Sequence, residues 1–241
     1  MGSNKKIAVI GRNGFIGSAL MRKFPDAYNY LRKDLDYVFW FAAPSSQILF
    51  NYAPTYCYAE TLSGFQNVLG FCMENNIKLI YPSTASYGNE YAQCKMDLET
   101  LQEQCEYKNV LGLRIYAGYG PLEAHKGEYA SVVYQFCKRM KEGKQPIIYG
   151  NGKQTRDFVF IDDIVDNIVE NIDKTGVIEL GTGVNHSFND IVQIINEELK
   201  TDLSPVYITK PESYIEETLC KNPANCKFSL REGIKEVLSG M

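Results

Sequence analysis

The sequence predicts an α/β fold: a doubly wound, mostly parallel sheet of the Rossmann type with a small C-terminal lobe. Apolar runs typical of strands lie at 6–10, 37–42, 77–81, 109–114 and 177–180. Helical stretches separate these runs, and such alternation produces a parallel sheet covered on both faces. A chain of 241 residues is long enough to bury a core of this kind.

The helical stretches are expected near 14–24, 55–75, 89–106, 128–142, 161–172 and 188–199. Between the first of them and Asp36 there is room for one strand at most, Ala27 to Leu31. A second crossover helix does not fit there, so we expect the first half of the sheet to be short.

A glycine-rich turn follows the first predicted strand. Gly11, Gly14 and Gly17 stand between that strand and the first helix. This arrangement points a helix N-terminus at a dinucleotide pyrophosphate, because the glycines allow a tight turn and close approach of the backbone. An ordinary strand-helix turn is the alternative interpretation of a lone glycine pattern.

The strongest chemical signal is the pair Tyr91 and Lys95, which follows a strand ending in Ser83 and Thr84. Four residues make about one helical turn, so the phenol and the ammonium project from one face. We expect the ammonium to lower the pKa of the phenol and to make it a usable base. A hydroxyl of Thr84 or Ser83 is expected to bond the same substrate oxygen.

The same Tyr-Lys spacing recurs elsewhere, and context separates the three cases. Tyr134 and Lys138 lie in a long amphipathic segment without an upstream strand, and Tyr149 and Lys153 span a turn. A surface lysine beside a half-buried tyrosine is the alternative reading for each pair.

Composition excludes several classes of function. The formal net charge of −4 and the lack of a basic block argue against a nucleic-acid partner on electrostatic grounds, and no run is long enough to span a membrane. Seven cysteines without metal-ligand spacing are expected to be reduced thiols in a cytoplasmic protein. With two histidines, neither a histidine metal site nor a Ser/His/Asp hydrolase is expected, so we predict no metal.

Taken together, these segments resemble the extended short-chain dehydrogenase/reductase family, the sugar-nucleotide epimerases and dehydratases. The resemblance runs through 11–17, 36–43, 64–69, 113–121 and 154–163 and reaches the C-terminal part at 179–183 and 228–234. It implies an NAD(P)-binding core at 1–115 plus 150–182 and a substrate lobe at 116–149 plus 183–241. It also implies a homodimer packed through helices 55–75 and 89–106.

The resemblance implies roles for individual residues. The catalytic residues would be Thr84, Tyr91 and Lys95. The cofactor would contact Gly11, Arg12, Asn13, Gly14, Phe15, Ile16, Gly17, Arg32, Asp34, Phe41, Ala42, Ala43, Pro44, Ser83, Tyr91 and Lys95. A nucleotide-diphosphate sugar would contact Ser86, Tyr116, Ile148, Tyr149 and Arg156. For Arg156 the role would be diphosphate binding, with an ion pair to a nearby aspartate as the alternative.

The identity of the cofactor stays open at this point. Asp34 resembles the family residue near the adenine of NAD, whereas Arg12, Arg32 and Lys33 suit a 2′-phosphate and hence NADP. The alternative is that these are solvated charges.

The residues after Thr84 indicate the kind of reaction. Dehydratases of the family carry an Asp-Glu pair there, whereas this chain has Ala85 and Ser86. We therefore expect a 4-epimerase that acts through a transient 4-keto sugar and retains NAD. The alternatives are an NADPH-dependent 4-keto-sugar reductase and a non-catalytic relative that only binds a dinucleotide.

Overall fold

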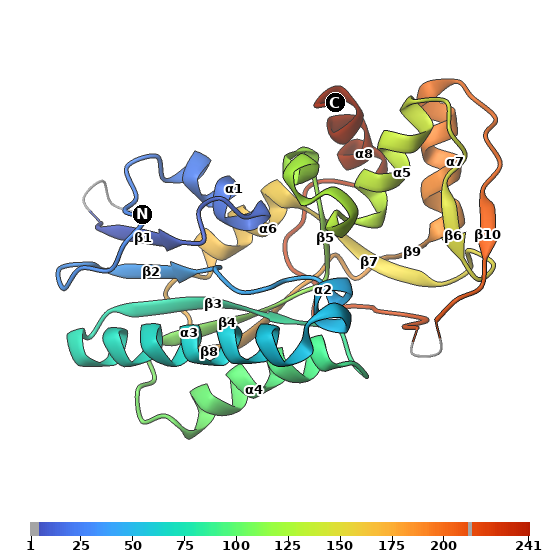
Figure 1. The fold of residues 1–241 in the computed structure, drawn as a ribbon. Helices are drawn as coiled ribbons and strands as arrows, with labels where there is room; N and C mark the ends of the chain where they lie inside the picture. The colour runs from blue at the N-terminus through green and yellow to red at the C-terminus, as the bar shows by residue number, and fades with distance from the viewer. Residues whose placement is uncertain (1–4, 212–213) are drawn as a thin grey trace. The chain divides into compact units, whose positions relative to one another are not determined.

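A computed structural model describes residues 5–211 and 214–241, and the predicted α/β fold is confirmed there (Figure 1). The main sheet has the strand order β1-β2-β3-β4-β8, with parallel pairing between β1 and β2, β2 and β3, and β3 and β4. Its strands are β1 (Ile7–Ile10), β2 (Tyr37–Trp40), β3 (Lys78–Thr84), β4 (Val110–Ile115) and β8 (Gly176–Leu180). Each coincides with one of the apolar runs expected from the sequence.

Helices connect these strands, and local residues determine where they begin and end. They are α1 (Phe15–Lys23), α2 (Gln47–Tyr52), α3 (Pro54–Asn75), α4 (Glu90–Gln104) and α6 (Ile161–Glu170). Pro54 begins α3, where its missing N–H costs nothing, and Asn76 ends it in the left-handed conformation with a φ of 55°. Asn89 caps α4 by accepting a hydrogen bond from the Ala92 N–H at 2.8 Å.

The chain divides into two compact units, each described by itself. The first contains the described residues up to Ile115 together with Val165–Glu179, and the second contains Tyr116–Ile164 and Leu180–Met241. The assignment of a cofactor role and a substrate role to separate parts of the chain stays a prediction.

The second unit has two small sheets with helices around them. In one sheet β7 (Thr155–Phe160) pairs in parallel with β5 (Ala117–Tyr119) and antiparallel with β9 (Asn185–Ser187). In the other, β6 (Ile147–Tyr149) pairs in parallel with β10 (Val206–Ile208). The helical segments are η1 (Pro121–Tyr129), α5 (Val132–Lys141), α7 (Phe188–Leu199) and α8 (Leu230–Ser239). Capping boxes at Ser187 and Ser229 begin α7 and α8.

The segment between α1 and β2 contains less strand than the sequence allowed for. The strand allowed for at Ala27 to Leu31 is only an isolated bridge between Ala8 and Tyr28. The Tyr28 N–H donates to the Ile7 carbonyl at 2.9 Å, and the chain then leaves the sheet toward β2. The short connection provides no length for a longer strand at this edge.

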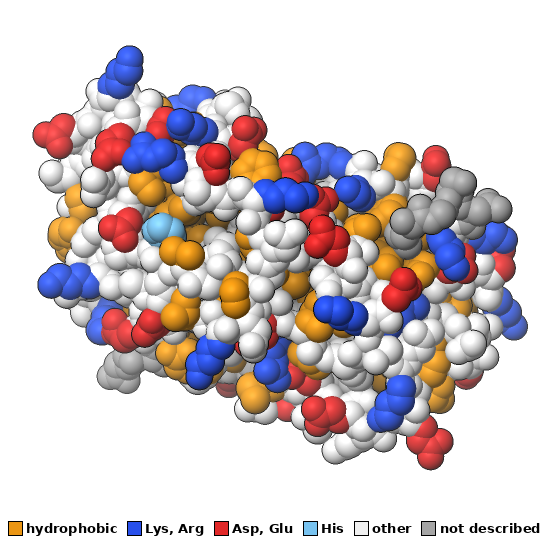
Figure 2. Space-filling model, turned by 180° about the vertical axis from the view of Figure 1, so that it is seen from behind, with side chains coloured by type: hydrophobic (Ala, Val, Ile, Leu, Met, Phe, Trp, Pro, Cys, Tyr) orange, Lys and Arg blue, Asp and Glu red, His pale blue; other side chains and the backbone are white. Residues whose placement is uncertain are grey.

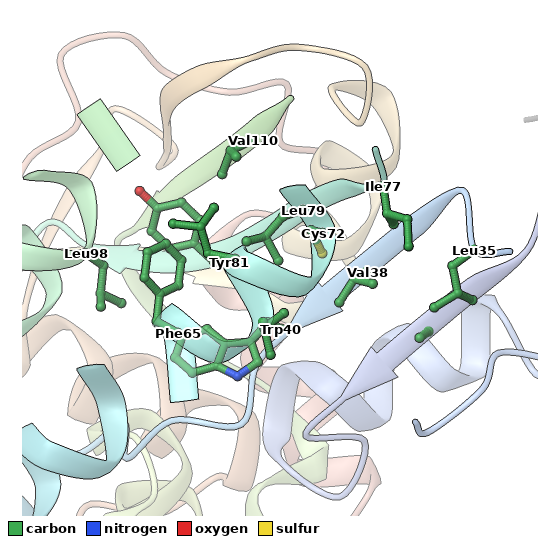
Figure 3. Close-up of a cluster of buried hydrophobic side chains, with 13 residues drawn as sticks. Leu35, Val38, Trp40, Phe65, Cys72, Ile77, Leu79, Tyr81, Leu98 and Val110 are labelled. Carbon is green, nitrogen blue, oxygen red and sulfur yellow. The ribbon is translucent and has the colours of Figure 1, made fainter. Parts of the chain in front are cut away.

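The core of the first unit fills the space between the sheet and the helices beside it. Figure 3 shows Phe65 of α3 lying between the rings of Trp40 from β2 and Tyr81 from β3. The ring centroids are 5.6 Å apart for Trp40 and Phe65 and 4.7 Å apart for Phe65 and Tyr81. Gly64 permits this packing, since a Cβ there would lie 3.2 Å from the Trp40 ring. The aromatic stack therefore holds the end of β2 in place.

The surface carries mixed charge. On the face seen in Figure 2, basic and acidic side chains are interspersed over the described residues. Among these residues, none of the helices combines the length and the apolar character that crossing a bilayer requires. The seven cysteines are free thiols. The part of the chain that is described contains no cluster of three His, Cys, Asp or Glu side chains arranged to hold a metal ion.

Candidate active site

The glycine turn between β1 and α1 has the geometry of a site for a bound phosphate. Gly11 has a φ of 93°, and a Cβ on it would lie 2.5 Å from the carbonyl carbon of Phe41. A Cβ on Gly17 would lie 2.1 Å from the Gly11 oxygen. Gly14 precedes α1 and has no side chain to cap its first amides. Backbone N–H groups at such a helix N-terminus suit an anion, so these residues fit the pyrophosphate of a dinucleotide.

The segment after β2 adjoins this turn. The Phe41 N–H donates to the Ile10 carbonyl at 2.7 Å, and Ala42 lies against Gly11. Ala43 and Pro44 continue the same segment. The structure thus brings together two sets of residues that the sequence assigned to the cofactor separately. The other residues of the glycine turn that were predicted to contact the cofactor are not equally exposed. Arg12 and Asn13 are exposed, whereas Phe15 and Ile16 are half-buried.

Arg32 and Asp34, which the sequence assigned to opposite cofactor preferences, bind one another. Arg32 donates from Nη2 to Asp34 Oδ2 at 2.8 Å and from Nε to Oδ1 at 2.5 Å. Its guanidinium also lies 4.5 Å from the centre of the Tyr28 ring. Hydrogen bonds from Arg32 and then from Lys6 lower the pKa of Asp34 to about 2. A second anion would have to compete with this carboxylate for the guanidinium, and the predicted cofactor contact of Arg32 stays a prediction.

Thr84 and Tyr91 come together at the end of β3 and the start of α4. The Thr84 hydroxyl lies near enough to the Tyr91 phenol to act on its pKa, which it lowers. The Thr84 hydroxyl also accepts the Ser86 N–H at 3.0 Å, which fixes the turn after the strand. The Tyr91 ring packs edge-on against Phe50 of α2 with centroids 5.5 Å apart. The predicted catalytic hydroxyl and phenol are therefore neighbours with restrained orientations.

Lys95 lies one turn after Tyr91 on α4 and is buried, with 1% of its surface exposed. Its ammonium is 6.0 Å from the centre of the Trp40 ring, at the outer limit of a cation–π contact. Burial lowers the pKa of Lys95 to about 8. Trp40 was not among the residues predicted for the site. The sequence does place Trp40 at the end of an apolar strand, but its contact with Lys95 depends on the fold and could not be predicted from that position.

The expected lowering of the Tyr91 pKa is wrong for this structure. Burial is the largest influence and raises the pKa of Tyr91, while the Thr84 hydroxyl opposes it. Desolvation disfavours the charged form of either side chain, so it raises the pKa of the phenol and lowers the pKa of the lysine. The sequence showed the spacing of the pair but not how deeply both side chains are buried.

Ser83 has a partner that the sequence did not indicate. Its hydroxyl donates to Glu99 of α4, and Arg114 of β4 donates to the same carboxylate from Nε at 2.9 Å. The Ser83 side chain is thus committed to Glu99, and its predicted cofactor contact stays untested. A signal was present, because Glu99 follows Lys95 by four residues and so lies on the same face of the helix.

In the second unit, Arg156 of β7 is held by backbone carbonyls and by rings. It donates to the Thr155 oxygen at 2.7 Å and to the Ile215 oxygen at 2.6 Å. Its guanidinium lies 5.6 Å from the Phe188 ring centre and 5.8 Å from that of Tyr214. These contacts fix the orientation of the guanidinium, and its predicted role in diphosphate binding stays a prediction.

Asp157, beside Arg156, has a structural task. It is fully buried and accepts the N–H groups of Thr182, Gly183 and Cys220 at 2.7, 2.8 and 3.1 Å. It also accepts the Thr182 hydroxyl at 2.6 Å. One carboxylate therefore holds the turn after β8 and the segment at Cys220.

The remaining residues predicted to contact the substrate differ in how exposed their side chains are. Tyr149 is 44% exposed and its ring centre lies 5.9 Å from that of Tyr214, whereas Ile148 is 1% exposed. Successive strand side chains point to opposite faces, so Ile148 faces inward, and its predicted substrate contact stays untested. Tyr116 is half-buried in this unit, and its N–H donates to the Leu180 oxygen at 3.1 Å. Ser86 is half-buried beside Thr84 in the first unit.

A sequence model of known proteins matches more than half of the chain. It describes the "NAD dependent epimerase/dehydratase family" and covers residues 27–181, so it includes the Thr84, Tyr91 and Lys95 region. The match begins after the glycine turn, whose interpretation therefore rests on its own geometry.

Individual relatives agree with this match. The chain is 33% identical over 174 residues to the ADP-L-glycero-D-manno-heptose-6-epimerase of Brachyspira hyodysenteriae, a stretch that is 61% of this chain. The match spans about half, 54%, of that relative's length.

Solved structures share the fold at lower identity. The UDP-glucose 4-epimerase of Thermotoga maritima has a TM-score of 0.88 with 22% identity, covering 98% of both chains. The NAD-dependent NDP-hexosamine 5,6-dehydratase of tunicamycin biosynthesis has a TM-score of 0.85 with 20% identity, covering 98% of this chain and 97% of its own.

Proposed function

Because this chain belongs to the NAD-dependent epimerase/dehydratase family, we propose that it is an NAD-dependent sugar-nucleotide 4-epimerase acting through a transient 4-keto sugar. The observation that carries the proposal is the proximity of the Thr84 hydroxyl to the Tyr91 phenol, with the buried Lys95 one turn further along α4. This trio suits proton transfer at a carbinol oxygen.

The cofactor that we propose is NAD, held at the glycine turn of Gly11, Gly14 and Gly17. Bound there, NAD would supply the hydride acceptor and donor that neither hydroxyl nor amine side chains provide. Two observations favour NAD over NADP: the family match and the engagement of Arg32 by Asp34. A 2′-phosphate would have to compete with the Asp34 carboxylate for the same guanidinium.

Thr84, Tyr91 and Lys95 would have different roles in proton transfer. Thr84 hydrogen-bonds the reacting sugar oxygen and orients it toward Tyr91. To take the proton when the hydroxyl becomes a ketone, Tyr91 must be the phenolate, a form that the positive charge of a bound nicotinamide would favour. The resulting phenol returns the proton when the ketone is reduced on its other face. A raised pKa suits the return step, because the phenol then carries the proton to be donated. Lys95, with a pKa of about 8, places an exchangeable proton on the same helix face.

Two other reactions are the candidates to compare. The ADP-L-glycero-D-manno-heptose-6-epimerase relative, 33% identical over 174 residues, favours epimerisation at C6 of a heptose. Elimination of water is disfavoured, because Ala85 and Ser86 supply no carboxylate pair next to Thr84. The reductase alternative requires NADPH, which the Arg32–Asp34 pair does not favour.

The first test is the identity of the bound dinucleotide. The purified protein is denatured and any released dinucleotide is identified by mass spectrometry, and we expect NAD. The NAD-bound protein is then assayed with UDP-glucose, UDP-N-acetylglucosamine and ADP-glycero-manno-heptose, with epimers separated by chromatography. Release of NADP, or consumption of NADPH without epimer formation, would overturn the proposal in favour of a reductase.

The catalytic assignment has its own test. We expect Tyr91→Phe to abolish epimerisation, a loss of at least about a thousandfold, because it removes the proton carrier. The fold should persist, since the ring and its contact with Phe50 remain. Full activity in this variant would show that Tyr91 is not the proton carrier.

A further inference from the structure

Two side-chain hydrogen bonds tie α4 to β3 beneath the candidate site. The Ser83 hydroxyl donates to Glu99, and the Tyr81 hydroxyl donates to Gln102 at 2.7 Å. Tyr81 and Ser83 are two residues apart on the strand, and Glu99 and Gln102 are three apart on the helix. Both pairs therefore lie along facing surfaces of the two elements.

The Glu99 tie has an ionic partner as well. Arg114 binds the carboxylate with two nitrogens, from Nε to Oε1 at 2.9 Å and from Nη2 to Oε2 at 2.5 Å. Ser83 and Arg114 face one another in the register of β3 and β4. Glu99 is only 6% exposed, and a buried carboxylate is stable only with such partners. Three elements thus determine the position of one group, and the two-nitrogen contact fixes its orientation.

The location of this tie relates it to the proposed chemistry. Ser83 immediately precedes Thr84, and Glu99 follows Lys95 by one helical turn. A shift of α4 along β3 would change the separation of the Thr84 hydroxyl from the Tyr91 phenol. The Tyr81–Gln102 bond lies further from these groups on both elements.

We propose that Glu99 is a positioning residue, which holds the α4 face bearing Tyr91 and Lys95 in register with the end of β3 bearing Thr84. Ser83 and Arg114 act through it. This inference rests on the proposed function for its catalytic consequence, but the positional role is a property of the fold. Misplacement of reacting groups by about 1 Å can cost about a hundredfold in rate.

The test compares variants that remove similar bonds at different places. Ser83→Ala and Glu99→Gln break or weaken the tie, and the double variant closes a double-mutant cycle. Tyr81→Phe removes the other buried hydroxyl bond, and Glu103→Gln removes an exposed carboxylate from the same helix. The first readout is hydrogen exchange of residues 84–95 by mass spectrometry, which needs no substrate. The second is kcat and KM for UDP-glucose on the NAD-bound protein, beside affinity for NAD.

We expect Ser83→Ala and Glu99→Gln each to raise the exchange rate in residues 84–95 by about tenfold or more. We also expect each to lower kcat by about tenfold with KM within about twofold, and the double variant to resemble the single ones. Tyr81→Phe should lower the melting temperature without either effect, and Glu103→Gln should match the wild type.

Three outcomes would overturn the inference. They are wild-type exchange in Glu99→Gln, an effect of Ser83→Ala that Glu99→Gln does not share, or equal effects of Tyr81→Phe on exchange and kcat. If the wild type does not turn over UDP-glucose, that part of the proposed function fails for this sugar, and the exchange result alone decides the positional role.

Discussion

Replacing Lys95 by methionine should make the protein more stable at neutral pH. The side chain is buried, and burial lowers its pKa from 10.5 to about 8. That difference corresponds to about 3 kcal/mol of unfolding free energy, which the folded protein loses by holding a buried ammonium at pH 7. Methionine has a similar length and no charge, so it avoids this cost. It also gives up the contact with Trp40, worth about 1 kcal/mol, which leaves a net gain of about 2 kcal/mol.

The sign of the pH dependence follows from proton binding. Between pH 8 and pH 10.5 the folded protein holds Lys95 mostly neutral while the unfolded chain keeps it protonated, so unfolding takes up a proton. The unfolding free energy of the wild type therefore rises with pH across this window. Below pH 8 both states are protonated and the full cost is present. The advantage of Lys95→Met should accordingly shrink by about 2 kcal/mol between pH 7 and pH 9.5.

Urea denaturation of wild type and Lys95→Met at both pH values measures this directly. Lys33→Met, at an exposed position, serves as the control and should stay within about 0.5 kcal/mol of the wild type. A Lys95→Met protein no more stable than the wild type at pH 7 would refute the reasoning. So would a stability difference of the same size at both pH values.

Trp40 provides a second readout because it is the only tryptophan of the chain. Its emission should change with a midpoint near pH 8 in the wild type and not in Lys95→Met. Burial raises the pKa of both Tyr91 and Cys94 above their ordinary values, so a midpoint near pH 8 does not belong to either of these neighbours on α4. A transition that persists in Lys95→Met would assign it to another group.

Two further predictions concern residues that hold backbone segments in place. Gly17→Ala should weaken NAD affinity by at least about tenfold, measured by calorimetry, because its Cβ would lie 2.1 Å from the Gly11 oxygen and the turn must shift; unchanged affinity would contradict a phosphate site at this turn. Asp157→Asn should cost about 2–4 kcal/mol in urea denaturation, because an amide has one acceptor oxygen for the donors at Thr182, Gly183 and Cys220; a loss under about 1 kcal/mol would show that Asp157 is not the anchor of these segments.

Local patterns in the sequence were enough for the parallel sheet and for part of the site. Strands and helices follow from runs of apolar residues, and each strand region of the main sheet was correctly placed. The glycine turn and the spacing of Tyr91 and Lys95 are likewise local, since a turn or a single helical turn decides them. Thr84 could be added because it ends the strand just before the helix.

Contacts between distant residues were beyond the reach of these patterns. The sequence alone left Arg32 and Asp34 as competing cofactor signals, and only the fold shows that they bind one another. Ile148 was assigned to the substrate from the family resemblance, and that its side chain is buried depends on its neighbours in the fold.

The sequence by itself determined which chemical groups the site offers and in what order they occur along the chain. Only the tertiary structure decided their energetics: that Lys95 is buried beside Trp40, that the pKa of Tyr91 rises, and that Glu99 binds Ser83. The physical reason is that spacing along a helix is fixed by covalent geometry, whereas desolvation and charge pairing depend on side chains brought together from remote parts of the chain.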